Sequence, residues 1–166
     1  MRLDTRQVQL KREAFQAAEL AQDAVLKLKP KADGAGVTLT VEGPRDLPLV
    51  RGDIGLVERV LTNLIENALT FTPPGGSVRV ALSGENGAVQ VSVIDTGAGI
   101  GPEDLPHVFD RFYRADRSRD RSRGGAGLGL AIAREIVELH GSLLQVESRV
   151  NEGTRFSFTL GAGPNA

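Results

Sequence analysis

The sequence predicts an α/β (α+β) two-layer sandwich in which helices cover one face of a mixed, mainly antiparallel sheet. Apolar residues recur at helical spacing in three separate segments of the 166-residue chain. Between these segments lie short runs that alternate apolar and polar residues and are bounded by turn-forming residues, as expected for half-buried strands. Helices and hairpins in this mixture are typical of two layers packed around one core.

The first third of the chain predicts a helix, a strand and a short extended segment. Apolar residues at steps of three and four predict a helix over 13–29, which Pro30 should kink or end because proline lacks an amide hydrogen. β-branched and apolar residues alternate over Val37–Val41 and predict a strand. Leu47–Val50 predicts an extended segment at a sheet edge, since it contains a proline.

The middle of the chain predicts a helix followed by a hairpin. Asp53 is a good N-cap, and an apolar stripe continues from it to about Thr70. Two strands, Ser77–Ser83 and Ala88–Asp95, flank an Asn-Gly pair, which is a strong hairpin signal.

The last part of the chain combines a long irregular stretch with a helix and two strands. Residues 96–126 show neither the helical nor the strand period of apolar residues. A loop of this length inside a compact domain is usually functional or disordered. A third helix is expected over 128–140, with Gly141 as its C-terminal cap. Alternation predicts the last two strands over 143–148 and 154–159.

Composition and the chain ends limit the organisation and the partners. We expect one folded domain over 13–160, a linker over 1–12 and a disordered tail over 161–166. The net charge of −1 gives no reason to expect nucleic acid or membrane contact, and the absence of cysteine excludes disulfides and thiolate metal sites. Neither a membrane-spanning run nor a signal peptide is recognisable, so we expect a cytoplasmic location.

Asn63 and Asn67 are the first candidate site residues. They stand four apart on the second helix and therefore project from one face, beside the apolar stripe. Amide oxygens are neutral, hard ligands that suit Mg²⁺ bound with substrate phosphates. The alternative is that both are ordinary solvated helix positions.

Asp95 is the second candidate, because it ends an apolar strand and is followed by Gly97 and Gly99. A carboxylate at a strand end can accept a hydrogen bond from an exocyclic amine such as N6 of adenine. The glycines would let backbone approach a flat ring closely. The alternative is an Asp-containing turn of no further function.

A glycine-rich segment, Gly124–Leu130, opens the third helix and predicts an anion site, because free N–H groups and the helix dipole favour phosphate. It is not a P-loop, which needs Lys-Ser/Thr after the last glycine, and Leu130 breaks the dinucleotide fingerprint. A flexible hinge is the alternative. The arginine-rich run 110–123 is interleaved with acidic residues, which favours a phosphate-facing lid or a solvated loop over nucleic-acid binding.

Together and in this order, the motifs resemble those of the histidine kinase ATPase-like family, the GHKL group with the left-handed Bergerat ATP-binding fold that includes gyrase, Hsp90 and MutL. The likeness is strongest to the catalytic, ATP-binding domain of a bacterial sensor histidine kinase and covers the chain from about residue 13. The motifs that carry it are Asn63–Ala68 (N box), Asp95–Ile100 (first glycine box), Phe109–Arg114 (F box), Gly125–Leu130 (second glycine box) and Gly153–Phe156.

The resemblance implies that the chain binds ATP and Mg²⁺. Asn67 would ligate Mg²⁺, Asn63 would support the phosphates, Asp95 would hold N6 of adenine, and Arg114 could reach the γ-phosphate. The implied ATP-binding residues are Asn63, Asn67, Asp95, Gly97, Gly99, Ile100, Gly125, Gly127, Leu128, Gly129, Leu130 and Thr154. Residues 101–124 would form a lid that Phe109 and Phe112 anchor, with disorder around 116–125.

The implied function is donation of the γ-phosphoryl group to a histidine on a separate helical dimerisation and phosphoacceptor domain, with a response regulator downstream. Residues 1–12 would then be a remnant of that helical domain, and the parent protein could be anchored in the inner membrane. Related ATPases resemble one another in carrying Glu where this chain has Asn63, and an amide cannot take a proton from water. A serine-kinase or ATPase relative and a degenerate nucleotide-binding scaffold remain the alternatives.

Two features depart from the family pattern. Thr70 stands where many relatives carry a Lys or Arg that neutralises phosphate, and Arg114 or Arg117 could substitute for it. No histidine followed by Glu or Asp opens a long helix, so the phosphoacceptor must come from elsewhere. His140 is expected to stabilise a helix end.

Overall fold

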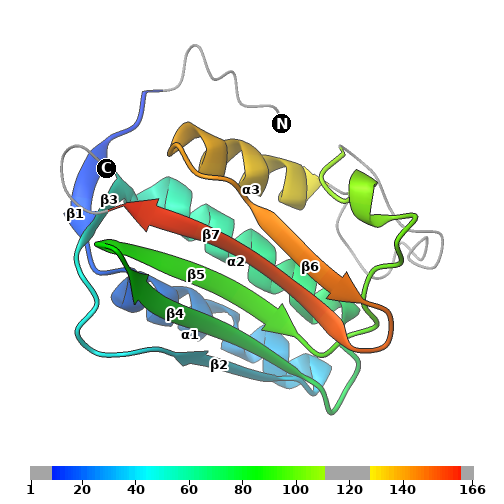
Figure 1. Ribbon diagram of the computed structural model, residues 1–166. Coiled ribbons are helices and arrows are strands. Elements are labelled where there is room, and N and C mark those ends of the chain that lie inside the picture. The colour runs from blue at the N-terminus through cyan, green and yellow to red at the C-terminus, as the bar shows by residue number, and fades with distance from the viewer. Residues whose placement is uncertain (1–8, 111–127, 162–166) are drawn as a thin grey trace.

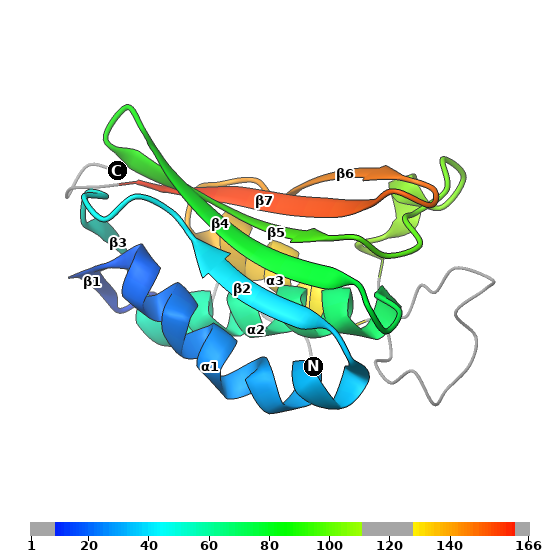
Figure 2. The ribbon, with the colours of Figure 1, turned by 90° about the horizontal axis from the view of Figure 1, so that it is seen from below.

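The computed structural model describes residues 9–110 and 128–161, and in this part of the chain three helices cover one face of a five-stranded sheet (Figure 1; Figure 2). The strand order is β2-β4-β5-β7-β6, in which β2 and β4 pair in parallel and all other neighbours pair antiparallel. The elements are α1 (Ala17–Ala35), α2 (Ile54–Phe71), α3 (Leu128–Leu139), β2 (Thr38–Glu42), β4 (Ser77–Glu85), β5 (Ala88–Asp95), β6 (Gln145–Arg149) and β7 (Gly153–Gly161). The predicted two-layer sandwich is confirmed.

The core lies between the sheet and the helices, and α2 runs through its middle. The Asp53 side chain accepts a hydrogen bond from the Leu56 N–H at 3.2 Å, so the predicted N-cap is confirmed. The apolar stripe of α2 is buried along its whole length: Val57, Val60, Leu61, Leu64, Ile65, Ala68 and Leu69. The predicted hairpin between β4 and β5 turns at Asn86 and Gly87, both at positive φ.

A second, two-stranded sheet was not predicted. β1 (Arg12–Phe15) pairs antiparallel with β3 (Val50–Asp53), and the helix expected from residue 13 therefore begins only at Ala17. Phe15 is 9% exposed and lies opposite Val50, which is fully buried. Because this pairing joins segments far apart in the sequence, the local period of apolar residues could not reveal it.

Of the two effects expected of Pro30, a kink or an end of the helix, the end was wrong, because α1 continues through Pro30 to Ala35. A helical proline removes one hydrogen bond to the carbonyl four residues earlier, here that of Leu26. Leu26 is 68% exposed and Pro30 is exposed too, so water can satisfy that carbonyl. The helix ends instead at Gly36, whose φ of 71° forms a left-handed C-cap.

The ends of several elements lie together at one end of the molecule. The C-terminal ends of α2 and β5 lie there beside the first turn of α3 and a short 3₁₀ helix, η1 (Leu105–His107), at the right of Figure 1. η1 gives structure to part of the stretch that showed no period in the sequence. Within residues 9–110 and 128–161, no helix combines the length and apolar character needed to cross a bilayer.

Candidate nucleotide-binding site

Asp95 is the last residue of β5, and its carboxylate is held in a buried turn. The side chain is 6% exposed, and its Oδ1 accepts a hydrogen bond from the Gly97 N–H at 2.8 Å. Burial raises the pKa of the Asp95 carboxyl, while hydrogen bonds from the backbone N–H groups of Gly97 and Thr154 oppose that shift. The ionised group can only accept hydrogen bonds, which suits it to an exocyclic amine.

Gly97 and Gly99 allow the loop after β5 to pack against backbone on two sides. A Cβ at Gly97 would meet the carbonyl oxygen of Phe71 at the end of α2. Gly99 has φ of +77°, and a Cβ there would meet the carbonyl oxygen of Arg149 at the end of β6. These contacts explain both glycines by protein packing, whereas the sequence had suggested approach to a flat ring.

A hydroxyl pair fixes the other side of this loop. The Ile100 N–H donates to Ser148 Oγ at 2.7 Å, and the hydroxyls of Ser148 and Thr154 lie 2.7 Å apart. Ser148 Oγ also bonds to the carbonyl of Gly153 at 3.0 Å. Thr154 is 7% exposed and lies opposite Asp95 in the sheet. Ser148 escaped the sequence analysis, since only the register of β6 and β7 places it opposite Thr154.

The two asparagines lie on α2, at successive turns leading away from the Asp95 corner, which is formed by Asp95, the loop to Ile100, and Thr154. Asn63 Nδ2 donates to the Gly129 carbonyl at 3.1 Å and so fastens the first turn of α3 to α2. Asn67 stands one turn closer to Phe71 and is partly buried, and its side-chain amide forms no hydrogen bond with another described residue. Because Phe71 contacts Gly97, α2 connects the asparagines with the Asp95 corner.

The donor set matches a magnesium ion that arrives with a nucleotide. Among the described residues, no group of three or more His, Cys, Asp or Glu side chains is arranged to hold a metal. Mg²⁺ keeps several waters and commonly binds through one or two protein oxygens together with substrate phosphates. The side-chain amide of Asn67, which has no partner among the described residues, would fit that mode.

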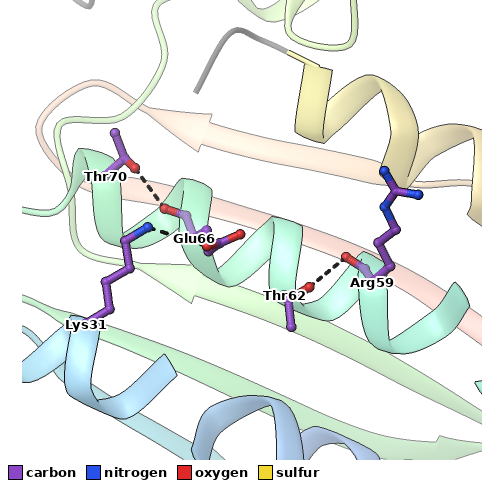
Figure 3. A network of polar contacts seen from close by, with 5 residues as sticks. All are labelled: Lys31, Arg59, Thr62, Glu66 and Thr70. Carbon is purple, nitrogen blue, oxygen red and sulfur yellow. Dashed lines mark hydrogen bonds and ion pairs between the residues drawn. The ribbon is translucent and has the colours of Figure 1, made fainter. Parts of the chain in front are cut away.

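Thr70 is uncharged, so it provides no positive charge at the site. Its hydroxyl donates to the backbone carbonyl of Glu66 at 2.9 Å, inside its own helix (Figure 3). Lys31 reaches from α1 to the Glu66 carboxylate at 3.4 Å, so its ammonium group is already paired.

The start of the expected lid is fixed to the body of the domain. The Phe109 ring packs edge-on against Phe156 of β7, with centroids 6.0 Å apart. The Arg134 guanidinium of α3 lies 5.5 Å from the centroid of the same ring. Nearby, His107 Nδ1 and Asp110 Oδ2 are 3.0 Å apart. Phe109 is therefore held against the body of the domain, as expected of a residue that anchors the lid.

Several expected site residues lie outside the described part of the chain: Phe112, Arg114, Arg117, Gly125, Gly127 and the segment 116–125. Leu128 begins α3, Gly129 contacts Asn63, and Leu130 is partly buried against the core.

His140 holds two helix ends together at the opposite end of α2. Its Nε2 accepts a hydrogen bond from the Asp53 N–H at 3.0 Å, and its Nδ1 donates to the Ile136 carbonyl at 2.8 Å. Both ring nitrogens are thus used in the neutral tautomer, which gives His140 the structural role expected of it.

Comparison with known proteins identifies the family. The model of the histidine kinase-, DNA gyrase B- and HSP90-like ATPases matches residues 52–164. The chain is 37% identical over 159 residues to the histidine protein kinase DivJ of Caulobacter vibrioides, covering 96% of this chain but 26% of DivJ. It therefore spans about a quarter of the length of that relative.

Solved kinase structures share the fold. Full-length ShkA in complex with AMPPNP matches with a TM-score of 0.83 and 27% identity, over 94% of this chain and 32% of ShkA. The nucleotide-free catalytic domain of ThkA matches with a TM-score of 0.79 and 26% identity, over 93% of this chain and 99% of that domain. ThkA in complex with the response regulator TrrA matches with a TM-score of 0.78 and 25% identity, over 94% of this chain and 43% of that one. Since the family model covers well over half of it, the chain belongs to the histidine kinase-, DNA gyrase B- and HSP90-like ATPases.

Proposed function

We propose that this chain is the ATP-binding catalytic domain of a sensor histidine kinase. It binds Mg·ATP and donates the γ-phosphoryl group to a histidine on a separate helical dimerisation and phosphoacceptor domain. A response regulator then acts downstream of that domain. The kinase names of DivJ, ShkA and ThkA, the AMPPNP bound to ShkA and the response regulator bound to ThkA support this proposal.

The observation that carries the proposal is the placement of Asp95 near the C-terminal end of α2, with Asn67 and Asn63 at successive turns of that helix. Asp95 and Thr154 offer a buried acceptor and a hydroxyl beside the end of α2, where adenine binds. Asn67 and then Asn63 follow along the helix and lead to the first turn of α3. The phosphates therefore extend from the Asp95 corner toward a helix N-terminus, which favours anions.

Asn63 favours transfer to another nucleophile over hydrolysis. A hydrolase of this fold needs a group that takes a proton from water, and the amide of Asn63 cannot do so. Its Nδ2 instead holds the Gly129 carbonyl, so Asn63 positions α3 relative to α2. The chain binds and orients the nucleotide, while the acceptor domain brings the attacking imidazole.

Catalysis by this domain consists of placement and neutralisation of charge. Asn67 would hold Mg²⁺, which supplies positive charge to the phosphate oxygens when it is bound. Asp95 orients the base, and the N–H groups in the first turn of α3 face the phosphates. The P–O bond to ADP breaks as the bond to the acceptor nitrogen forms, and ADP leaves.

The direct test is phosphoryl transfer from γ-labelled ATP to a supplied acceptor domain. The natural acceptor domain of the parent protein is mixed with this chain or with Asp95→Asn, and label on histidine is followed over time. Transfer by the wild type that the variant loses is the expected result. ATP binding without any transfer would refute the kinase function and favour the degenerate scaffold, whereas release of phosphate without labelled histidine would favour an ATPase.

A further inference from the structure

Arg59 is the only basic residue of α2, and it stands in line with the asparagines of the site. It precedes Asn63 by four residues, and Asn63 precedes Asn67 by four, so the three side chains share one face of the helix. Arg59 is partly buried, and its guanidinium forms no ion pair or hydrogen bond within residues 9–110 and 128–161. A guanidinium in this state offers planar donors to an anion and has little water to lose.

Two lysines of α1 that reach toward α2 are already neutralised. Lys27 pairs with Glu58 at 2.8 Å, and Lys31 pairs with Glu66 at 3.4 Å. Figure 3 shows Lys31 meeting Glu66 in the space between α1 and α2, while Arg59 projects from α2 away from that pair. Among these three cations, only Arg59 is left for an external anion.

The position of Arg59 along α2 selects which part of a nucleotide it can meet. The base end of the site lies at the C-terminus of α2, where Phe71 contacts Gly97. Arg59 lies twelve residues before Phe71, which is about 18 Å along a helix, and it comes after both asparagines in that direction. The group farthest from the base is the terminal phosphate.

We propose that Arg59 binds the terminal phosphate of the nucleotide and supplies positive charge at the end of the site farthest from Asp95. The inference rests on the proposed function, because it requires ATP in the site with its base at Asp95. Arg59 acts here as a ligand for the γ-phosphate, so it should distinguish ATP from ADP.

The test is calorimetric titration of Mg·ATP and Mg·ADP into the wild type, Arg59→Gln and Lys31→Gln. The last variant is the matched control, since it removes one exposed charge from the neighbouring helix. Loss of one charge-assisted contact should lower the ATP affinity of Arg59→Gln about tenfold. Its ADP affinity should stay within about twofold of the wild type, and Lys31→Gln should change neither nucleotide.

The outcomes separate this inference from the proposed function. A wild type that binds neither nucleotide refutes both. A wild type that binds ATP while Arg59→Gln loses nothing, loses ATP and ADP equally, or behaves like Lys31→Gln refutes the role of Arg59 alone.

Discussion

Replacing Gly99 by alanine should destabilise the domain more than the same replacement at Gly87. The two glycines have nearly the same backbone conformation, with φ of +77° and +79°. They differ in surroundings, because a Cβ at Gly87 meets nothing within 4 Å, whereas one at Gly99 meets the carbonyl of Arg149. The pair therefore separates the cost of the left-handed conformation from the cost of lost packing space.

The magnitude follows from adding the two costs. A left-handed conformation costs a residue with a side chain about 1–2 kcal/mol, which both alanine variants share. Forcing an extra carbon into a packed position costs about 1–3 kcal/mol more, and only Gly99 has this penalty. We expect Gly87→Ala to lose about 1–2 kcal/mol and Gly99→Ala about 2–5 kcal/mol.

The assay is urea unfolding followed by far-ultraviolet circular dichroism. Both variants and the wild type are compared at their midpoints, and an unchanged slope shows that the unfolded state is the same. Gly141→Ala is a second control, since Gly141 has φ of +75° and a Cβ added there would meet no atom within 4 Å.

Equal destabilisation of Gly99→Ala and the two controls would refute the reasoning. It would mean that the loop after Asp95 moves away from Arg149 at no cost. The glycine would then be explained by its conformation alone, and the packing of this loop against β6 would not shape the site.

Three further predictions follow from single contacts. His140→Ala should lose about 1–3 kcal/mol in urea unfolding, because it leaves the Asp53 N–H without its acceptor, while ATP affinity measured by calorimetry stays unchanged. Asp95→Asn should raise the free energy of unfolding at about pH 7, because the pKa of Asp95 is raised above its ordinary value of 3.8 in the folded protein, so that ionising the buried carboxyl costs stability. This gain should shrink as the pH falls through the raised pKa, where the carboxyl of the wild type becomes protonated. A difference between variant and wild type that stays constant with pH would contradict the prediction. Ser148→Ala should lose about 1–3 kcal/mol and weaken ATP binding, since the Ile100 N–H loses its partner, and unchanged values in both assays would exclude Ser148 from the site.

Local patterns in the sequence were enough to predict the elements whose formation depends on neighbouring residues. The apolar stripe and N-cap of α2 and the Asn-Gly turn of the β4–β5 hairpin are written in neighbouring residues, and the structure has them where they were expected. The pairing of β1 with β3 depends on contact between distant segments, so it was missed. The continuation of α1 through Pro30 depends on which side of the helix faces water, which the helical period alone did not settle.

The candidate site likewise contains residues that local sequence could reveal and residues whose roles depend on contacts in the folded chain. Asp95 and Asn63 could be singled out because a strand end and helical spacing are visible in the sequence. The reason for Gly97 and Gly99 lies in the carbonyls of Phe71 and Arg149, which approach only when the chain is folded. Ser148 became visible only through its register with Thr154.

The most direct test of the ATP site is calorimetric titration of Mg·ATP into the wild type, Asp95→Asn and Asp46→Asn. Asp46 is exposed in the loop before β3, so its variant removes the same charge away from the site. The account predicts that the wild type and Asp46→Asn bind alike and that Asp95→Asn, although folded, loses binding. Binding by Asp95→Asn as tight as that of the wild type would contradict the placement of adenine at the end of β5.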